Sequence, residues 1–338
     1  TVVTKLIAAG ALVDKARTID GQTPLLVAST NGHLAVVTKL IAAGALVDKA
    51  RTTDGATPLL IASTNGHLAV VTKLIAASAD VDKAMTTDGT TPLLMAAQNG
   101  HLAVVTKLIA AGAEVNKAET TEGGTPLYIA AQKGHLTVAT KLIAAGALVD
   151  KARTTDGQTP LLVAAYKGHL TVVTKLIAAG ALVDKASTTD GSTPLWVAAQ
   201  NGHTAIVSKL LQHGADKTIC GFRNKTPLEA AQRMNHAEVV AVLLNHEMSF
   251  IDHLHRYSLV LTLAAIAMVV LLLVLCYRAD LLVCRRVRGY FDKRRRRTVR
   301  EKKRQAKEAK RLDGMRQKRE LRKAKEKEMA ATRKFKAE

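Results

Sequence analysis

The sequence predicts an all-α repeat solenoid, followed by one transmembrane helix and a basic tail that is helical or disordered. A Thr-Pro-Leu triplet recurs every 34 residues, with a last copy after 33. Periods of this length are typical of solenoids, whose units bury their apolar faces only against their neighbours. Each unit also holds two short helical patterns, and an uncharged run follows the last unit. The triplets begin at Thr23, Thr57, Thr91, Thr125, Thr159, Thr193 and Thr226.

Each unit begins with a short apolar helix. In the unit 23–56, Thr23 occupies the N-cap, and Pro24 takes the first helical position, where its missing N–H costs nothing. The apolar run that follows ends near Asn31-Gly32, a pair suited to a left-handed C-cap. The sequence therefore predicts a helix of about two turns here.

A second helix begins after His33 and ends at Gly44, with most of its apolar residues on one side. Asp54-Gly55 is a tight-turn signal, so we expect a projecting β-hairpin loop before the next triplet. Both helices are shorter than about a dozen residues, and isolated helices of that length are marginal in water. Stacking of the units is therefore expected to supply the stability.

These units resemble the ankyrin repeat. The resemblance rests on the Thr-Pro-Leu start, the Asn-Gly-His-Leu turn, the Val-Val…Leu-Ile helix and the Gly-Ala…Val-Asp exit. It covers residues 1–248, as a partial first repeat and seven units, and residues 249–256 are interpreted as a linker. The chain departs from the family in two ways. Leu, Tyr, Trp or Glu follows Thr-Pro-Leu where the family usually has His, and the period exceeds the usual length of about 33 by one residue in the hairpin.

In ankyrin-like arrays, the hairpin tips and first helices line a concave face that binds partner proteins, so the resemblance implies an unidentified protein partner. Tyr128 and Trp196 are the large residues on first helices, and such residues are favoured at binding hot spots. The candidate protein-binding residues are Arg17, Gln22, Arg51, Met85, Gln98, Glu119, Tyr128, Gln132, Arg153, Gln158, Tyr166, Ser192, Trp196 and Gln200.

One histidine recurs at the start of each second helix, from His33 to His236. Equivalent atoms of stacked units lie roughly 8–10 Å apart, which is too far for two of them to share a metal ion through bonds of about 2.1 Å. We therefore expect these histidines to form structural hydrogen bonds. The recurring acids of the hairpins, such as Asp54, are expected to form turns.

No sequence pattern indicates catalysis or a cofactor. The chain shows no Gly-rich phosphate loop and no Ser or Cys in a nucleophile context. Its three cysteines give neither a disulfide framework nor a paired metal spacing. We therefore expect a protein that is not an enzyme.

The two ends of the array differ. Residues 1–5 align with residues 171–175, inside a second helix and without an initiator Met. We therefore expect the chain to be a fragment of a longer protein. The last unit is the most divergent and the most polar, which suits a capping repeat whose outer face meets water.

Residues 257–277 are predicted to form a transmembrane helix. They carry no charge, and at a rise of 1.5 Å per residue such a helix spans a hydrocarbon core of about 30 Å. Most of them are Leu, Val or Ile, which favours insertion by several kcal/mol. Tyr257 and Tyr277 stand at the two edges, where aromatic rings prefer the headgroup level.

Residues 278–338 are predicted to form a basic tail that lies in the cytosol. They hold 26 Lys or Arg and 9 Asp or Glu, so most of the chain's net charge of +21 belongs to the tail. Basic residues near the bilayer edge attract anionic lipid by about 1 kcal/mol each. The candidate headgroup contacts are Arg285, Arg286, Arg288, Lys293, Arg294, Arg295, Arg296 and Arg297.

The sequence does not determine on which side of the membrane the array lies. The positive-inside rule places the basic tail in the cytosol and the repeats on the other side. Ankyrin-like arrays are mostly cytosolic, however, and no export signal is visible in the chain.

The sequence thus predicts a membrane-anchored adaptor or scaffold, in which the array binds another protein and the polybasic tail contacts anionic lipid. One alternative is a fragment of a multi-span ankyrin-repeat channel or acyltransferase, although this chain shows one span and the motifs of neither. The other is nucleic-acid binding through the tail, which would be salt-dependent and non-specific. Nucleic acid is not the expected partner, because only Tyr290, Phe291 and Phe335 offer stacking platforms there.

Overall fold

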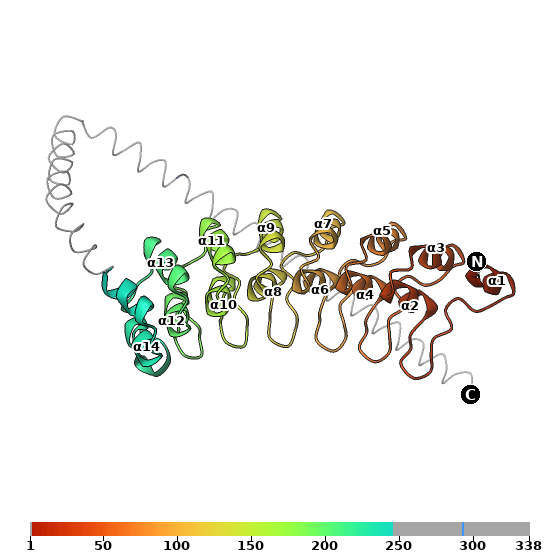
Figure 1. Ribbon diagram of the computed structural model, residues 1–338. Coiled ribbons are helices and arrows are strands. Elements are labelled where there is room, and N and C mark those ends of the chain that lie inside the picture. The colour runs from red at the N-terminus through yellow and green to blue at the C-terminus, as the bar shows by residue number, and fades with distance from the viewer. Residues whose placement is uncertain (1, 246–292, 294–338) are drawn as a thin grey trace, which may run out of the picture. The chain divides into compact units, whose positions relative to one another are not determined.

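The computed structural model describes residues 2–245 and, beyond them, only Lys293, which is helical and exposed. Figure 1 shows the first helices of the units in one row and the second helices in another. The first helices are α2 (Pro24–Thr30), α4 (Pro58–Thr64), α6 (Pro92–Gln98), α8 (Pro126–Lys133), α10 (Pro160–Lys167), α12 (Pro194–Gln200) and α14 (Pro227–Arg233). The second helices are α1 (Val2–Ala8), α3 (Leu34–Ala42), α5 (Leu68–Ala76), α7 (Leu102–Ala110), α9 (Leu136–Ala144), α11 (Leu170–Ala178) and α13 (Thr204–Gln212).

Two further helical segments lie before and after α14. A short 3-10 helix, η1 (Phe222–Asn224), lies in the loop before α14. Residues 237–245, the last continuously described stretch, are helical as well. The helix at 237–245 is the second helix of the last unit and ends the described array.

The predicted caps of the first helices are confirmed. Thr23 has extended backbone geometry, and its Oγ1 accepts a hydrogen bond of 3.2 Å from the N–H of Leu26. The same bond recurs in every unit that follows. A capping threonine stabilises a helix by roughly 1 kcal/mol, which matters for helices of only seven or eight residues.

The histidine row forms the predicted hydrogen bonds, and these bonds join one unit to the next. Nε2 of His67 lies 2.9 Å from the carbonyl oxygen of Thr30 in the preceding unit. A carbonyl can only accept, so Nε2 carries the proton and donates. The bond recurs at His101, His135, His169, His203 and His236. Each of these six histidines, from His67 onward, therefore fixes the start of its own second helix against the end of a neighbouring first helix.

The hydrophobic core runs between the two rows of helices. Leu59 and Leu60 of α4 and Leu74 of α5 are at most 1% exposed, and the equivalent leucines are buried in the neighbouring units. Complete burial of a leucine side chain stabilises a fold by about 1.5–3 kcal/mol. First helices contact first helices, and second helices contact second helices, all along the array. The predicted stacking of units is thus confirmed.

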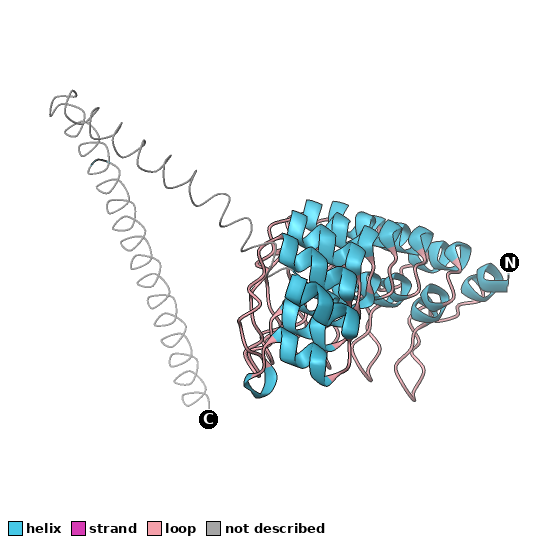
Figure 2. Ribbon diagram, turned by 60° about the vertical axis from the view of Figure 1, so that its left-hand side comes forward, coloured by secondary structure: helices cyan, strands magenta, loops and turns pink. Residues whose placement is uncertain are grey.

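The loops turn back on themselves without forming strands, so the predicted β-hairpins are wrong. The N–H of Arg51 donates to the carbonyl of Ala56 at 2.9 Å and closes the loop. The next N–H, that of Thr52, donates instead to the carbonyl of Asp20 in the preceding loop, at 3.0 Å. Backbone groups that would extend a hairpin thus form hydrogen bonds to the neighbouring loop instead. Figure 2 accordingly shows loops and no strand among the described residues.

The predicted membrane segment cannot be compared with this fold. No helix within the described residues has the length and apolar character needed to cross a membrane. The linker 249–256, the segment 257–277 and all of the tail 278–338 except Lys293 lie outside the described residues.

Candidate protein-binding groove

A cavity of about 310 Å³ lies across three first helices and the two loops between them. We call it the central groove. It is lined by Tyr128, Gln132, Arg153, Gln158, Leu162, Val163, Tyr166, Lys167, Ser187, Asp190, Ser192, Trp196, Val197 and Gln200. Eight of these are candidate binding residues from the sequence, so α8, α10, α12 and the loops between them bring more than half of the candidates to one site.

The floor of the central groove is apolar. Leu162 and Val163 of α10 are each 2% exposed, and Val197 of α12 is 6% exposed. These residues form part of the continuous core cluster of the array. Because these residues are packed into the core, the floor has a fixed shape, and the small part of it that faces the cavity is apolar.

Tyr128 and Arg153 form one wall of the central groove. Tyr128 is 1% exposed, and its hydroxyl lies 3.3 Å from Oε1 of Gln158, which accepts the hydrogen bond. The guanidinium of Arg153 lies over the Tyr128 ring, 5.4 Å from its centroid. Burial raises the pKa of Tyr128 to about 12, although the charge of Arg153 acts in the opposite direction. The phenol is therefore a neutral donor at physiological pH.

Arg153 is held in place by two carboxylates. Its Nε donates to Asp156 of its own loop at 3.1 Å, and its other nitrogens contact Asp156 and Glu122 of the preceding loop. The hydrogen bond from Arg153 to Asp156 raises the pKa of the guanidinium. Burial opposes ionisation of Asp156, but hydrogen bonds from Arg153 and the N–H of Gln158 outweigh it and lower the pKa of this carboxyl. The wall is therefore charged but internally paired.

A substitution in the preceding loop makes this second contact of Arg153 possible. Glu119 occupies the position that arginine takes in three other loops. Its carboxylate accepts from the N–H groups of its own loop, including that of Gly124 at 2.8 Å. In other loops an aspartate performs this task and accepts from the N–H of the residue two positions after it, as Asp54 does from Ala56 and Asp156 from Gln158. Glu122 is thereby left free to reach Arg153.

The rim of the groove carries polar groups that can still bind a ligand. Tyr166 is 45% exposed, and Nζ of Lys167 lies 5.0 Å from the centroid of its ring. Within the part of the chain that the structure describes, the side-chain amides of Gln132 and Gln200 make no hydrogen bond. A side-chain amide has both donor and acceptor atoms, as a peptide group does. The rim therefore matches the hydrogen-bonding groups of a polypeptide backbone.

Trp196 serves the fold as well as the groove. It is 4% exposed, and its Nε1 donates to the carbonyl of Lys225 at 2.8 Å. A β-carbon added to Gly221 would lie 2.9 Å from the Trp196 ring, so the last loop rests directly on the indole. Only an edge of this large side chain is left for a ligand.

The remaining candidates lie elsewhere. Arg17 and Gln22 line a wide, open cavity of about 540 Å³ beside α2. Four candidates line neither cavity, and they are Arg51, Met85, Gln98 and Glu119. Apart from Lys293, the candidate headgroup contacts lie outside the described residues.

Sequence reasoning missed six residues of the central groove. They are Leu162, Val163, Lys167, Ser187, Asp190 and Val197. Two of them have a signal in the sequence: Ser187 takes the position of the candidate Arg153 in the next unit, and Lys167 lies next to the candidate Tyr166. The other four look like ordinary core or turn residues. Among the described residues, no group of three or more His, Cys, Asp or Glu could hold a metal ion.

The comparisons with known proteins agree with this architecture. A family model of three ankyrin repeats matches residues 1–85, 71–153, 93–186, 141–220 and 181–253. The chain therefore belongs to the ankyrin-repeat family. Among solved structures, the crystal structure of the human ASB11 ankyrin repeat domain is similar, with a TM-score of 0.60 and 28% sequence identity. The likeness covers 67% of this chain and 98% of that one. No curated protein matched the sequence.

Proposed function

We propose that the chain is a membrane-anchored, non-enzymatic adaptor whose central groove binds an extended segment of a partner protein. Ankyrin repeats are protein-interaction scaffolds, and the family is typically non-enzymatic. The observation that carries the proposal is the collection of eight predicted binding residues around one cavity. An extended segment suits the groove because the apolar floor can take side chains, while the free amides of Gln132 and Gln200 can pair with its backbone.

The groove predicts a measurable role for Tyr166. Replacement of this residue by Ala is expected to weaken binding of a groove ligand by about tenfold, because a half-exposed tyrosine at the centre of a groove is a typical hot spot. The probe is a linear peptide selected from a displayed random library by the purified full-length chain. Its affinity is then measured by fluorescence polarisation with the variant chain.

A matched control comes from the same unit. Leu182 is 57% exposed and lies outside the groove, so Leu182→Ala removes apolar surface without touching the site. Its affinity should equal that of the unaltered chain. An equal loss of peptide affinity in both variants would contradict the proposed use of the groove. So would an unchanged affinity in Tyr166→Ala.

The membrane part of the proposal rests on the sequence of residues 257–277 and on the basic residues that follow. In this arrangement the segment crosses the bilayer once, and Arg285, Lys293 and their basic neighbours contact anionic lipid. The tail then lies in the cytosol. The array would be held at a membrane surface, where its partner is captured.

Two charges in the centre of the segment should abolish the anchor. Each charged residue there opposes insertion by about 2.5–3.5 kcal/mol, so Val270→Lys with Leu273→Asp outweighs the apolar residues that favour it. The full-length chain, expressed in cells, should stay in the membrane pellet after an alkaline carbonate wash, and the double variant should be released. Release of the unaltered chain by the same wash would exclude the anchor.

A further inference from the structure

The last loop, which leads into α14, reverses a charge that the other loops keep. Three residues before the triplet threonine, the other loops have Asp20, Asp54, Asp88, Glu122, Asp156 and Asp190, whereas the last loop has Arg223. Asp190, for example, accepts a hydrogen bond of 3.0 Å from the N–H of Ser192. An arginine cannot accept such a bond. The last loop instead forms η1, in which Arg223 and Asn224 have φ values of 61° and 54°.

Two more polar positions become cationic at the end of the array. Gln200 near the end of the groove corresponds to Arg233 in α14, and Ser192 corresponds to Lys225. The row of neutral side chains along the rim of the central groove thus continues, one unit later, as a row of positive charges.

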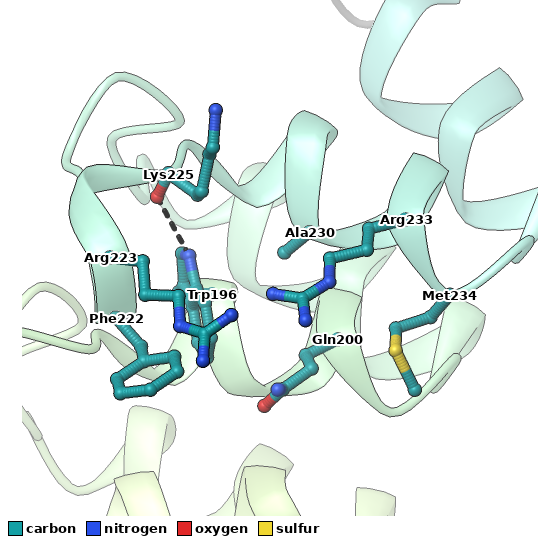
Figure 3. Close-up of a pocket in the computed structure, with 8 residues that line it drawn as sticks. All are labelled: Trp196, Gln200, Phe222, Arg223, Lys225, Ala230, Arg233 and Met234. Atoms are coloured by element: carbon teal, nitrogen blue, oxygen red, sulfur yellow. Dashed lines mark hydrogen bonds between the residues drawn. The ribbon is translucent and has the colours of Figure 1, made fainter.

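These cations line a separate small cavity of about 140 Å³, which we call the arginine pocket. It is lined by Trp196, Gln200, Phe222, Arg223, Lys225, Ala230, Arg233 and Met234, without a carboxylate among them. Figure 3 shows the guanidinium groups of Arg223 and Arg233 pointing toward one another beside Trp196. The volume is far below the roughly 300 Å³ at which pockets begin to enclose drug-sized ligands, so a single side chain is the natural occupant.

The two arginines of the pocket lack the partners that other arginines of the array have. Nζ of Lys225 lies 3.2 Å from Oε1 of Glu229 and is therefore paired. The guanidinium of Arg223 lies 5.1 Å from the centroid of the Phe222 ring, and it has no carboxylate partner among the residues that the structure describes. Arg233 has no carboxylate partner within the described residues. The loop arginines of three other units, by contrast, each pair with an aspartate of their own loop.

We infer that the arginine pocket binds one carboxylate of an acidic segment in the partner polypeptide. This inference rests on the proposed function, because the carboxylate belongs to the segment that occupies the central groove. Trp196 and Gln200 line both cavities, so one extended chain can reach from one to the other. Two guanidinium groups can bind a carboxylate through short, charge-assisted hydrogen bonds. Phe222 and Met234 add apolar side chains to the lining of the pocket.

The surroundings favour a single acidic side chain over a polyanion. Asp190 lines the central groove, and Asp156 and Glu122 flank its Arg153 wall. A phosphodiester backbone that entered the arginine pocket would carry further charges past these carboxylates. A peptide with one acid at the correct spacing avoids that repulsion.

The test compares peptides selected by two forms of the full-length chain. A displayed library of random linear peptides is selected on the unaltered chain and on Arg223→Gln with Arg233→Gln. The unaltered chain should enrich Asp or Glu at one fixed position, and the double variant should lose this preference while keeping the rest of the motif. A synthetic peptide with the enriched acid should bind the double variant at least about tenfold more weakly, because hydrogen bonds between charged groups are lost.

Two controls separate the possible failures. Lys5→Gln with Lys39→Gln removes the same charge from α1 and α3 and should change neither the motif nor the affinity. Circular dichroism of each variant verifies that the array is folded. This inference alone would be overturned if the enriched peptides carried no acid. It would also be overturned if the double variant enriched the same acid as the unaltered chain. No enrichment by the unaltered chain would overturn the proposed function with it, and arginine-dependent binding of an oligonucleotide in place of acidic peptides would overturn the choice of ligand.

Discussion

Replacing Trp196 by Ala is expected to lower the free energy of unfolding of the last units by about 3–5 kcal/mol, the range for the loss of a large buried aromatic side chain. Trp196 is 4% exposed, and its Nε1 donates to the carbonyl of Lys225. The last loop rests on the indole, so the substitution opens a cavity beneath it and leaves a carbonyl without its partner. α14 should lose its support as well, because it packs on α12.

Hydrogen exchange with mass spectrometry can localise this effect. Protection should fall in η1 and α14 and stay unchanged in α4 and α6, because each unit of a solenoid contacts only its neighbours. Trp196→Phe keeps most of the volume and loses the hydrogen bond, so it should cost about 1 kcal/mol. A uniform loss of protection along the array, or no loss at all in Trp196→Ala, would contradict the role assigned to the indole.

The second large effect is expected at Gly134, which joins two units through the histidine row. Gly134 ends α8 with φ +78°, and a β-carbon there would lie 2.7 Å from Nδ1 of His169. The ring would have to move, and its hydrogen bond of 3.0 Å to the carbonyl of Gln132 would be lost. The left-handed backbone costs about 1–2 kcal/mol for alanine, and the lost bond adds about 1–3 kcal/mol. Gly134→Ala should therefore destabilise the array by about 2–5 kcal/mol.

Gly146 offers a matched control for this substitution. Its φ is +86°, but a β-carbon there meets no atom within 4 Å. Gly146→Ala should show only the backbone cost of about 1–2 kcal/mol. Chemical denaturation of both variants gives the two free energies of unfolding, and their difference measures the contact between units. Equal values would show that His169 contributes nothing to the stacking.

The repeats could be predicted from the sequence because each local signal has a single physical solution. Thr23 before Pro24 can cap a helix, and the capping bond is present in the structure. The histidines could be assigned to hydrogen bonds because the spacing of the units excludes a shared metal ion. The loops were predicted less well. Asp54-Gly55 indicates a turn but does not say where the flanking backbone groups find partners, and Thr52 finds its partner in the preceding loop.

The candidate site shows the same limit more clearly. Alignment of the units gave the positions on the binding face, yet it could not choose among equivalent units. The groove forms around Tyr128, Tyr166 and Trp196, where large side chains alternate with short ones. Which units form the groove therefore depends on how these side chains pack. Arg51 occupies the same position as Arg153 in another loop but lines neither the groove nor the cavity beside α2. Arg223 and Arg233 could not be recognised as a site from the sequence, because only the fold places them around one pocket.

The most direct test of the groove as the binding surface is photo-crosslinking of a selected peptide to the full-length chain. A peptide chosen by the unaltered chain carries a photoreactive residue at each position in turn, and mass spectrometry identifies the residues to which it attaches. Crosslinks are expected on α8, α10, α12 and the loops between them, with Tyr166 and Gln200 among the attached residues. Crosslinks confined to the second helices, such as α9 and α11, would contradict the groove as the site of partner binding.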